Sequence, residues 1–252
     1  MNCKYFRELI TLVVVLTPLL LTPDHAVRAA GKPGQSTPEK TTTPTDKKEQ
    51  VQKTKRIIYK PPSRGAPAAR VGAGTRGVEG AGPELHVLTP DHTGYSSSPQ
   101  PTLYWYLSKT MSARFEVALI NDFDIEPIME TTLDREIKAG INRLDLADYG
   151  VSLKPGVVYQ WSVALVTDPG QRSSDSIASG RVKYVPLSEA QKTNLDAVSD
   201  DEAMWFFANA GYWYDLYDRL SGLITKQPDN KNLVSQRAAL LKQVGLQAVT
   251  ER

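Results

Sequence analysis

The segment LKPGVVYQWSVAL, residues 153–165, decides the fold. From residue 157 onward every second side chain is large and apolar: Val157, Tyr159, Trp161, Val163 and Leu165. The side chains between them are Val, Gln, Ser and Ala, which are mostly smaller or more polar. An alternation with a period of two is typical of a half-buried β-strand. The segment therefore predicts a strand over residues 157–167.

Similar short apolar runs, separated by turn signals, lie on both sides of this strand: 85–88, 102–107, 114–120, 127–133, 141–146 and 177–185. Seven strands in about a hundred residues predict an antiparallel β-sandwich of the immunoglobulin or fibronectin III type over residues 84–186. The order Leu153, Pro155, Gly156 and Tyr159 also resembles a corner of fibronectin type III domains. This resemblance implies that the Tyr159 hydroxyl bonds a nearby backbone group and fixes the corner.

After Pro186 the period of the apolar residues changes from two to nearly four, which predicts a C-terminal helical region over residues 187–252. One helical stripe is formed by Phe206, Ala210, Trp213, Tyr217, Leu220 and Ile224. We expect Gly211 to separate two helices and residues 230–244 to form a third. The region partly matches a tetratricopeptide repeat at Gly211, Trp213, Leu216, Leu220 and Pro228. A lone repeat buries no continuous core, so we expect it to pack on the sandwich or on a partner.

The first 29 residues have the pattern of a secretory signal peptide. Lys4 and Arg7 form a basic leader, and residues 9–21 form an apolar run of thirteen. This run is shorter than the roughly 18 to 20 residues that span a bilayer, so we expect cleavage. An uncleaved leader would act as an N-terminal membrane anchor. Cys3 is the only cysteine, so the predicted mature protein, exported to the periplasm or cell envelope, has no disulfide.

A basic arm precedes an acidic body. Residues 30–82 carry a net charge of +7, whereas residues 83–252 carry −6. Residues 30–60 are rich in Pro, Thr and Lys, which predicts a disordered linker, and residues 61–83 form a basic Gly/Arg-rich segment. Its arginines suit either phosphate and carboxylate groups of a ligand or the acidic body itself: Arg64, Arg70 and Arg76. The G-x-G-x-x-G at residues 72–77 lacks the flanking strand and helix of a nucleotide site.

Five ordered motifs resemble the domain-of-unknown-function 928 family, which is mainly cyanobacterial. They are RGAPAARVGAGTRG (64–77), PTLYWYL (101–107), LKPGVVYQWSVAL (153–165), DPGQRSS (168–174) and AGYWYDLYDRLSGLI (210–224). The resemblance runs from about residue 64 to about residue 246. It implies an exported bacterial protein with the same layout, and it assigns no catalytic residue.

Aromatic residues are concentrated over residues 205–217. Their helical spacing predicts that most belong to the core, but two short helices cannot bury all of them between themselves. The excess packs on the sandwich or forms a ligand-binding surface. The candidate binding residues are therefore the three arginines of the arm together with Trp205, Tyr212, Trp213, Tyr214 and Tyr217.

Metal and cofactor sites are not predicted. After cleavage His86 and His92 are the only histidines and no cysteine remains, which leaves no usual zinc site. Asp122, Asp124 and Glu126 form a D-x-D-x-E that lacks the glycine and the distant glutamate of a calcium loop, so we interpret it as a hairpin turn.

The pattern as a whole favours a non-catalytic binding or scaffolding protein with a protein partner in the envelope. The alternative is a binder of envelope glycan or of an anionic surface, which would use the basic arm and exposed aromatics. A hydrolase is a remote alternative, since the G-x-S-x-G elbow is absent from the sequence. Export argues against a nucleic-acid partner.

Overall fold

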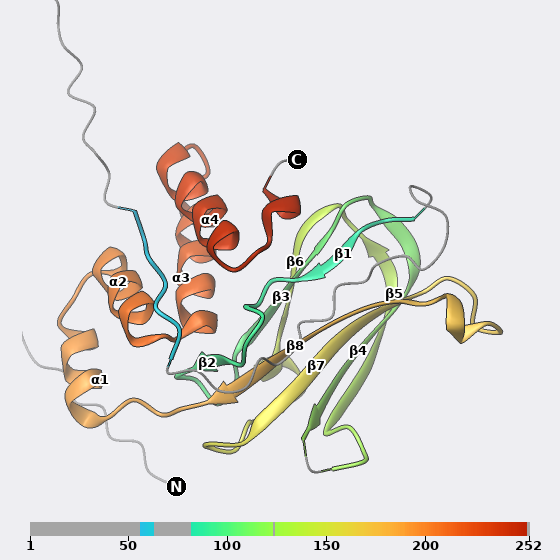
Figure 1. The fold of residues 1–252 in the computed structure, drawn as a ribbon, viewed down its shortest axis with the longest axis horizontal. Coiled ribbons are helices and arrows are strands. Elements are labelled where there is room, and N and C mark those ends of the chain that lie inside the picture. The colour runs from blue at the N-terminus through green and yellow to red at the C-terminus, as the bar shows by residue number, and fades with distance from the viewer. Residues whose placement is uncertain (1–55, 63–81, 123, 251–252) are drawn as a thin grey trace, which may run out of the picture. The chain divides into compact units, whose positions relative to one another are not determined.

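The computed structural model describes residues 56–62, 82–122 and 124–250 (Figure 1). Within these residues the chain forms two mostly antiparallel sheets, followed by four C-terminal helices. The fold is thus mainly β with a C-terminal α part, as the sequence predicts. The predicted signal peptide (1–29) and most of the predicted linker lie outside the described residues.

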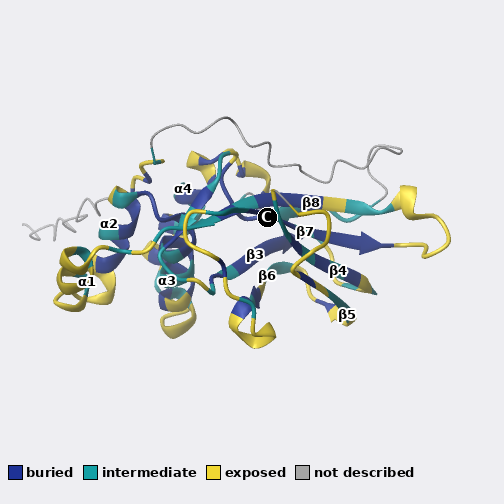
Figure 2. Ribbon diagram, turned by 90° about the horizontal axis from the view of Figure 1, so that it is seen from below, coloured by how far each residue is buried: buried dark blue, intermediate teal, exposed yellow. Residues whose placement is uncertain are grey.

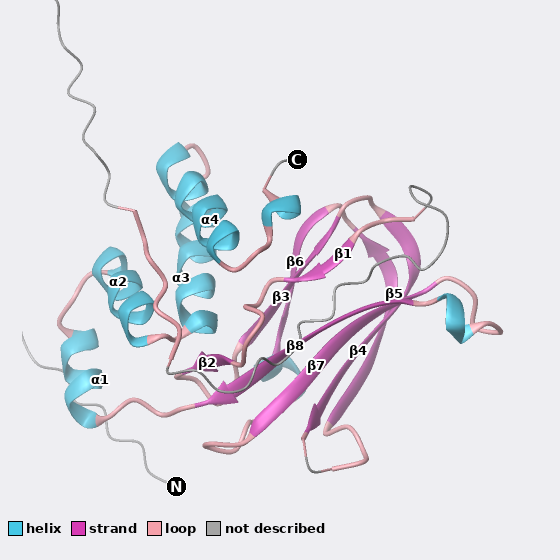
Figure 3. Cartoon of the chain, viewed as in Figure 1, coloured by secondary structure: helices cyan, strands magenta, loops and turns pink. Residues whose placement is uncertain are grey.

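The smaller sheet has three antiparallel strands in the order β1-β3-β6: β1 (Leu85–Val87), β3 (Thr102–Leu107) and β6 (Gly140–Asp145). The larger sheet has the order β2-β8-β7-β4-β5: β2 (Gly94–Ser96), β8 (Ser176–Tyr184), β7 (Val158–Val166), β4 (Met111–Asn121) and β5 (Met129–Ile137). Neighbouring strands within this sheet are antiparallel, except that β2 and β8 are parallel. Figure 3 shows the two groups of strands beside the helices.

Strand β7 forms the centre of the larger sheet and places its apolar side chains in the core. Trp161 and Val163 are buried, and they lie opposite Leu119 and Val117 of β4 in the register. On β3 of the other sheet Trp105 is likewise buried. The first half of β7 alternates as the sequence predicts, whereas on β3 every residue from Leu103 to Leu107 is buried, so both faces of that strand are covered.

All seven predicted runs lie on strands. The eighth strand, β2, was not predicted, because its three residues, Gly-Tyr-Ser, are too few to show an alternation. It pairs with the end of β8 at the edge of the sheet, from Gly94↔Val182 to Ser96↔Tyr184.

The helices are α1 (Glu189–Asp196), α2 (Asp200–Ala210), α3 (Trp213–Lys226) and α4 (Lys231–Gln243). Ser188 and Ser199 begin α1 and α2 with capping boxes, in which serine and a side chain three residues later bond each other's backbone N–H. Gly211 ends α2 in the left-handed conformation, so it separates two helices as predicted. The predicted third helix is confirmed as α4. Each described helix is too short or too polar to cross a membrane.

Helix α3 joins the helical region to the sheets. Trp213 Nε1 donates to the Leu88 carbonyl at 2.9 Å, and Trp161 Nε1 of β7 donates to the Tyr214 hydroxyl at 2.8 Å. The Tyr104 hydroxyl of β3 donates to Asp218 at 2.7 Å. In Figure 2 buried residues run through the sheets and through α2, α3 and α4, whereas α1 is largely exposed. Sheets and helices therefore share one hydrophobic core.

Candidate functional site

Residues 56–62, which we call the strap, lie between α2 and α4 (Figure 1). We call the surface around this segment, formed by α2 and α4 together with Trp213 and His92, the strap groove. Residues 56–60 belong to the predicted disordered linker, and here the structure differs from the prediction. Ile57 is 1% exposed and Tyr59 is 7% exposed. Burial of these two side chains offsets the entropy of ordering the segment, an effect that composition averaged over 30–60 does not show.

Two glutamine side chains of α4 hold the strap by its backbone. Gln236 Oε1 accepts from the Ile57 N–H at 2.8 Å. Gln243 Nε2 donates to the Ile57 carbonyl at 2.8 Å, and Gln243 Oε1 accepts from the Tyr59 N–H at 3.0 Å. Gln236 and Gln243 are seven residues apart, about two helical turns, and so lie on one face of α4. Bonds of this kind require an extended backbone but not a particular side chain.

The opposite wall of the groove is α2. The Lys60 N–H donates to the carbonyl of Ala208 at 2.9 Å, so the strap backbone bonds to both helices. Ile58, between the two buried side chains, is 61% exposed. Alternate side chains of the strap therefore enter the groove, as in an extended strand.

Tyr59 fills the deeper part of the groove. Its ring meets the Trp213 ring edge-on, with centroids 5.1 Å apart, and is stacked on His92 at 5.9 Å. Its hydroxyl lies 3.1 Å from His92 Nε2 and donates to the Gly211 carbonyl at 3.4 Å. Tyr59 is thus fixed from α3, from the α2–α3 junction and from the loop before β2.

The contacts of Tyr59 resemble a relay, because His92 Nδ1 in turn lies 3.3 Å from Asp91 Oδ1. Burial raises the pKa of the Tyr59 hydroxyl well above its usual value, with smaller contributions from the neighbouring Tyr214, Tyr95 and Asp91. A nucleophilic hydroxyl needs a lowered pKa or an assisting base that takes its proton. Here the hydroxyl stays protonated and donates to a backbone carbonyl, which suits binding of the strap rather than covalent chemistry.

Gly211 lets the strap approach closely. Its φ is +81°, in the region that favours glycine. A Cβ added there would lie 2.9 Å from Pro62 Cδ and 3.0 Å from the Lys60 carbonyl oxygen. The residue that ends α2 is therefore also a contact surface for the strap.

Two hollows adjoin the strap. One of about 230 Å³ lies at its Ile57 end, between Met204 and Trp205 of α2 and Leu233 of α4. The other, about 740 Å³ and open, lies beside Ile58, and its lining includes the small residues Ala238 and Ala239 of α4 as well as Arg56 and Lys242. The groove is thus larger than the segment that it holds.

A polar cleft also lies between α2 and α3. Asp215 accepts from the Ser97 N–H at 2.9 Å and from the Ser97 hydroxyl. Burial raises the pKa of Asp215 to about 6, and Asp218 adds to this shift, whereas the bonds from Ser97 oppose it. Asp200 and Arg219, which form an ion pair, line the same 270 Å³ cleft. Because each of these groups has a partner in the fold, we assign the cleft a structural role.

A comparison of the sequence with known protein families identifies the family of this chain. A family model described as Domain of Unknown Function (DUF928) matches residues 71–252. The chain belongs to this family. The DUF928 domain includes both sheets and all four helices described above, so it forms both walls of the strap groove, but its matched range begins nine residues after the strap ends.

Other known proteins add little to the DUF928 assignment. No curated protein matches the chain significantly. One solved structure that it resembles is astrotactin-2, described as a conserved vertebrate-specific and perforin-like membrane protein involved in neuronal development. The identity is 14%, the TM-score is 0.29, and the match covers 68% of this chain and 36% of that chain. A similarity at this level carries no argument about fold or function.

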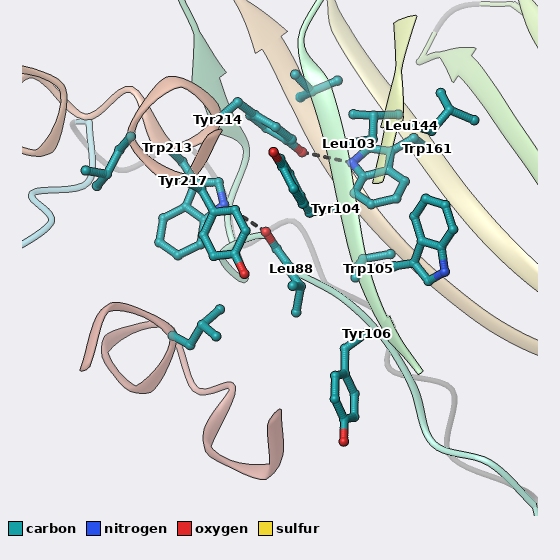
Figure 4. Packing of buried hydrophobic residues seen from close by; sticks show 14 of the residues in the cluster. Leu88, Leu103, Tyr104, Trp105, Tyr106, Leu144, Trp161, Trp213, Tyr214 and Tyr217 are labelled. Carbon is teal, nitrogen blue, oxygen red and sulfur yellow. Dashed lines mark hydrogen bonds between the residues drawn. The ribbon is translucent and has the colours of Figure 1, made fainter. Parts of the chain in front are cut away.

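The aromatic candidates of the DUF928 domain are mostly core residues (Figure 4). Tyr212, Trp213, Tyr214 and Tyr217 are each no more than 5% exposed. The Tyr214 hydroxyl donates to the Arg181 carbonyl at 3.1 Å, and the Tyr217 ring meets the Tyr104 ring edge-on at 5.0 Å. The structure thus places these four between α3 and the sheets and not on an exposed binding surface.

Two of the aromatic candidates contact the strap groove. Trp213 contacts Tyr59, and the half-buried Trp205 lines the hollow at the Ile57 end. Arg64, Arg70 and Arg76 lie outside the described residues, so their two alternatives stay predictions. Among the described residues no cluster of His, Cys, Asp or Glu is suited to a metal ion.

Sequence reasoning missed the strap and the glutamines that hold it. The only signal was the short apolar group Ile57, Ile58 and Tyr59 within a polar stretch. Gln236 and Gln243 gave no signal, because glutamine is an ordinary surface residue of helices. Their spacing becomes informative only when α4 and the strap are seen together.

Proposed function

We propose that the protein is an exported, non-catalytic binding or scaffolding protein of the bacterial cell envelope, and that its DUF928 domain works through contacts with another protein. The observation that supports this most is the strap groove. Two helices and the loop before β2 are arranged to hold an extended polypeptide segment, largely by backbone hydrogen bonds. Holding an extended segment is a common task of protein-recognition domains.

We further propose that the sheets form a fibronectin III or immunoglobulin-like sandwich and that α2–α4 form a tetratricopeptide-like unit. The Lys154 N–H donates to the Tyr159 hydroxyl at 3.1 Å, the corner bond that the sequence resemblance implies. Gly211 lies between two helices whose facing sides are apolar. Both kinds of module often bind proteins, but this support is an analogy between folds.

The proposal is tested by affinity purification from mildly crosslinked envelopes with tagged full-length chains. Three chains are compared: the natural one, Gln236→Ala/Gln243→Ala, and Arg64→Ala/Arg70→Ala/Arg76→Ala. We expect a specific envelope protein with the natural chain and the arginine variant, and much less of it with the glutamine variant. Envelope polymer or lipid retained by the natural chain, lost with the arginine variant and released by salt would instead establish the glycan or anionic-surface alternative.

A further inference from the structure

We propose that the strap groove is a binding site for an extended segment of another protein, one with an aliphatic residue and a tyrosine two positions apart, and that the strap occupies this site in cis. This inference rests on the proposed function and names the chemistry of the partner. Four observations carry it.

The first observation is the family boundary. The walls of the groove lie within the matched range 71–252, whereas the strap lies before it. Residues 63–81 separate the strap from the first described residue of the domain, so the strap is joined to the domain through 19 residues. The groove is thus part of the domain, and its occupant is an attached segment.

The second observation is that the groove recognises the backbone of the segment that it holds. Gln236, Gln243 and the Ala208 carbonyl hold the strap through its backbone N–H and C=O groups. Any extended segment except one with proline at these positions offers the same N–H and C=O groups. These bonds give affinity without sequence preference, as in the addition of a strand to a sheet edge.

The third observation concerns side chains. Ile57 and Tyr59 are buried, whereas Ile58 between them is 61% exposed. The Tyr59 hydroxyl finds both His92 Nε2 and the Gly211 carbonyl, so the deeper position favours tyrosine over phenylalanine. The groove therefore selects an aliphatic residue, any residue, and then tyrosine.

The fourth observation is the unfilled space. Beside Ile58 the face of α4 is hollowed over about 740 Å³, where Ala238 and Ala239 lie between the basic residues Arg56 and Lys242, and Ile58 itself is exposed. The side chains of Ile57 and Tyr59 are buried in the groove, but no side chain of the strap fills this hollow. A partner segment with a larger central side chain would bury more apolar surface than the strap does, which is how it would compete.

Competition is needed because the strap is tethered. A segment that is covalently joined to its own site binds there intramolecularly, which corresponds to a high effective concentration, on the order of millimolar for a short connection. A partner must therefore bind more tightly than the strap, or arrive when the strap is displaced. Occupation in cis reduces the apparent affinity for any segment added from outside.

The test uses the purified full-length chain and a fluorescent heptapeptide of residues 56–62, RIIYKPP, in anisotropy titrations. Ile57→Ser/Tyr59→Ser weakens the strap and leaves the groove intact. We expect this variant to bind the peptide about tenfold or more tightly than the natural chain. Ile58→Ser is the matched control: its side chain is exposed, so it should behave as the natural chain does. Adding Gln236→Ala/Gln243→Ala should abolish binding, as should a peptide with serine in place of both Ile57 and Tyr59.

Three results would overturn the proposal. The first is a folded Ile57→Ser/Tyr59→Ser variant that does not bind the peptide. The second is misfolding of this variant and of the milder Tyr59→Ser while Ile58→Ser folds, which would show that the domain needs the strap in order to fold, so that no partner could replace it. The third is strap exchange between natural chains, seen as dimers by light scattering at the concentrations used, since a second copy would then supply the segment. The titrations use purified components, so they are independent of the envelope purification. Absence of peptide binding would still allow a protein partner to bind elsewhere on the domain. Failure to recover a partner from envelopes would not change the outcome of the peptide titrations.

Discussion

Gly211 ends α2 in the left-handed conformation and also lets the strap approach closely. A pair of glycine substitutions tests this account. Gly211→Ala should destabilise the protein by about 1–2 kcal/mol from the left-handed backbone alone, and its Cβ should push the strap away. Gly222→Ala is the matched control, because Gly222 lies within α3 and an added Cβ meets nothing within 4 Å. It should stabilise by about 0.5–1 kcal/mol. Urea unfolding measures both, and equal effects would contradict the account of Gly211.

The raised pKa of Asp215 predicts that the stability of the protein depends on pH. Its pKa is raised from 3.8 to about 6 in the folded protein, mainly by burial. Between these pH values the folded state binds more protons than the unfolded state, so its free energy of unfolding falls as pH rises. The stabilisation that the protonated Asp215 gives is fully present below about pH 4 and is lost above about pH 6. The free energy of unfolding should fall by about 1–3 kcal/mol across this range.

The Asp215 effect is isolated by comparison with Asp215→Asn. The amide oxygen still accepts from the Ser97 N–H and the side chain no longer titrates, so the variant should lose less stability than the natural chain between pH 4 and pH 7. Urea unfolding at several pH values gives the difference. Parallel profiles for the two proteins would show that Asp215 titrates normally.

Single residues differ in how far the sequence predicts them. The Tyr159 hydrogen bond follows from a local pattern, since Lys154 is only five residues away. The bond of Asp215 joins it to Ser97, 118 residues earlier, and no local pattern indicates it. The burial that raises the pKa of Asp215 is likewise a product of tertiary packing.

At the scale of elements, Tyr214 of α3 fastens the helical region to β7 and β8. Tyr214→Phe removes the acceptor of Trp161 Nε1 and the donor to the Arg181 carbonyl, both in or near the core. We expect a loss of about 2–4 kcal/mol, because a buried donor is left without a partner. The control is Tyr217→Phe, whose hydroxyl lies near Ser221 but makes no hydrogen bond within the described part of the chain. Its unfolding free energy in urea should change by about 0.5 kcal/mol or less, and similar losses in both variants would argue against this role of Tyr214.

The elements that sequence reasoning predicted are those with a long apolar period. The seven predicted strands and the helices around Gly211 each carry several apolar residues at strand or helix spacing. Helix α1 was missed because it has no buried residue, and β2 because it has three residues. The strap was missed because its extended form depends on α2 and α4, which lie about 150 to 180 residues away in sequence.

At the scale of the whole molecule, the sheets and the helical region should unfold together. Trp213, Tyr214 and Asp218 all bond across their contact, and the buried residues form one cluster. We expect coincident urea transitions by far-ultraviolet circular dichroism and by tryptophan fluorescence. Removal of residues 187–252 should leave an aggregating product, since the faces that pack on α3 become exposed. Two separate transitions, or a folded truncated product, would contradict this.

The claim that residues 56–62 occupy the strap groove is tested most directly by amide hydrogen exchange, measured by NMR on the full-length chain. Ile57, Tyr59 and Lys60 donate their N–H groups to Gln236, Gln243 and the Ala208 carbonyl. Ile58 donates to none of the described residues. The account predicts slow exchange at the first three amides and fast exchange at Ile58, with protection of Ile57 and Tyr59 lost in Gln236→Ala/Gln243→Ala. Exchange of all four amides at the rate of an unstructured peptide would contradict it.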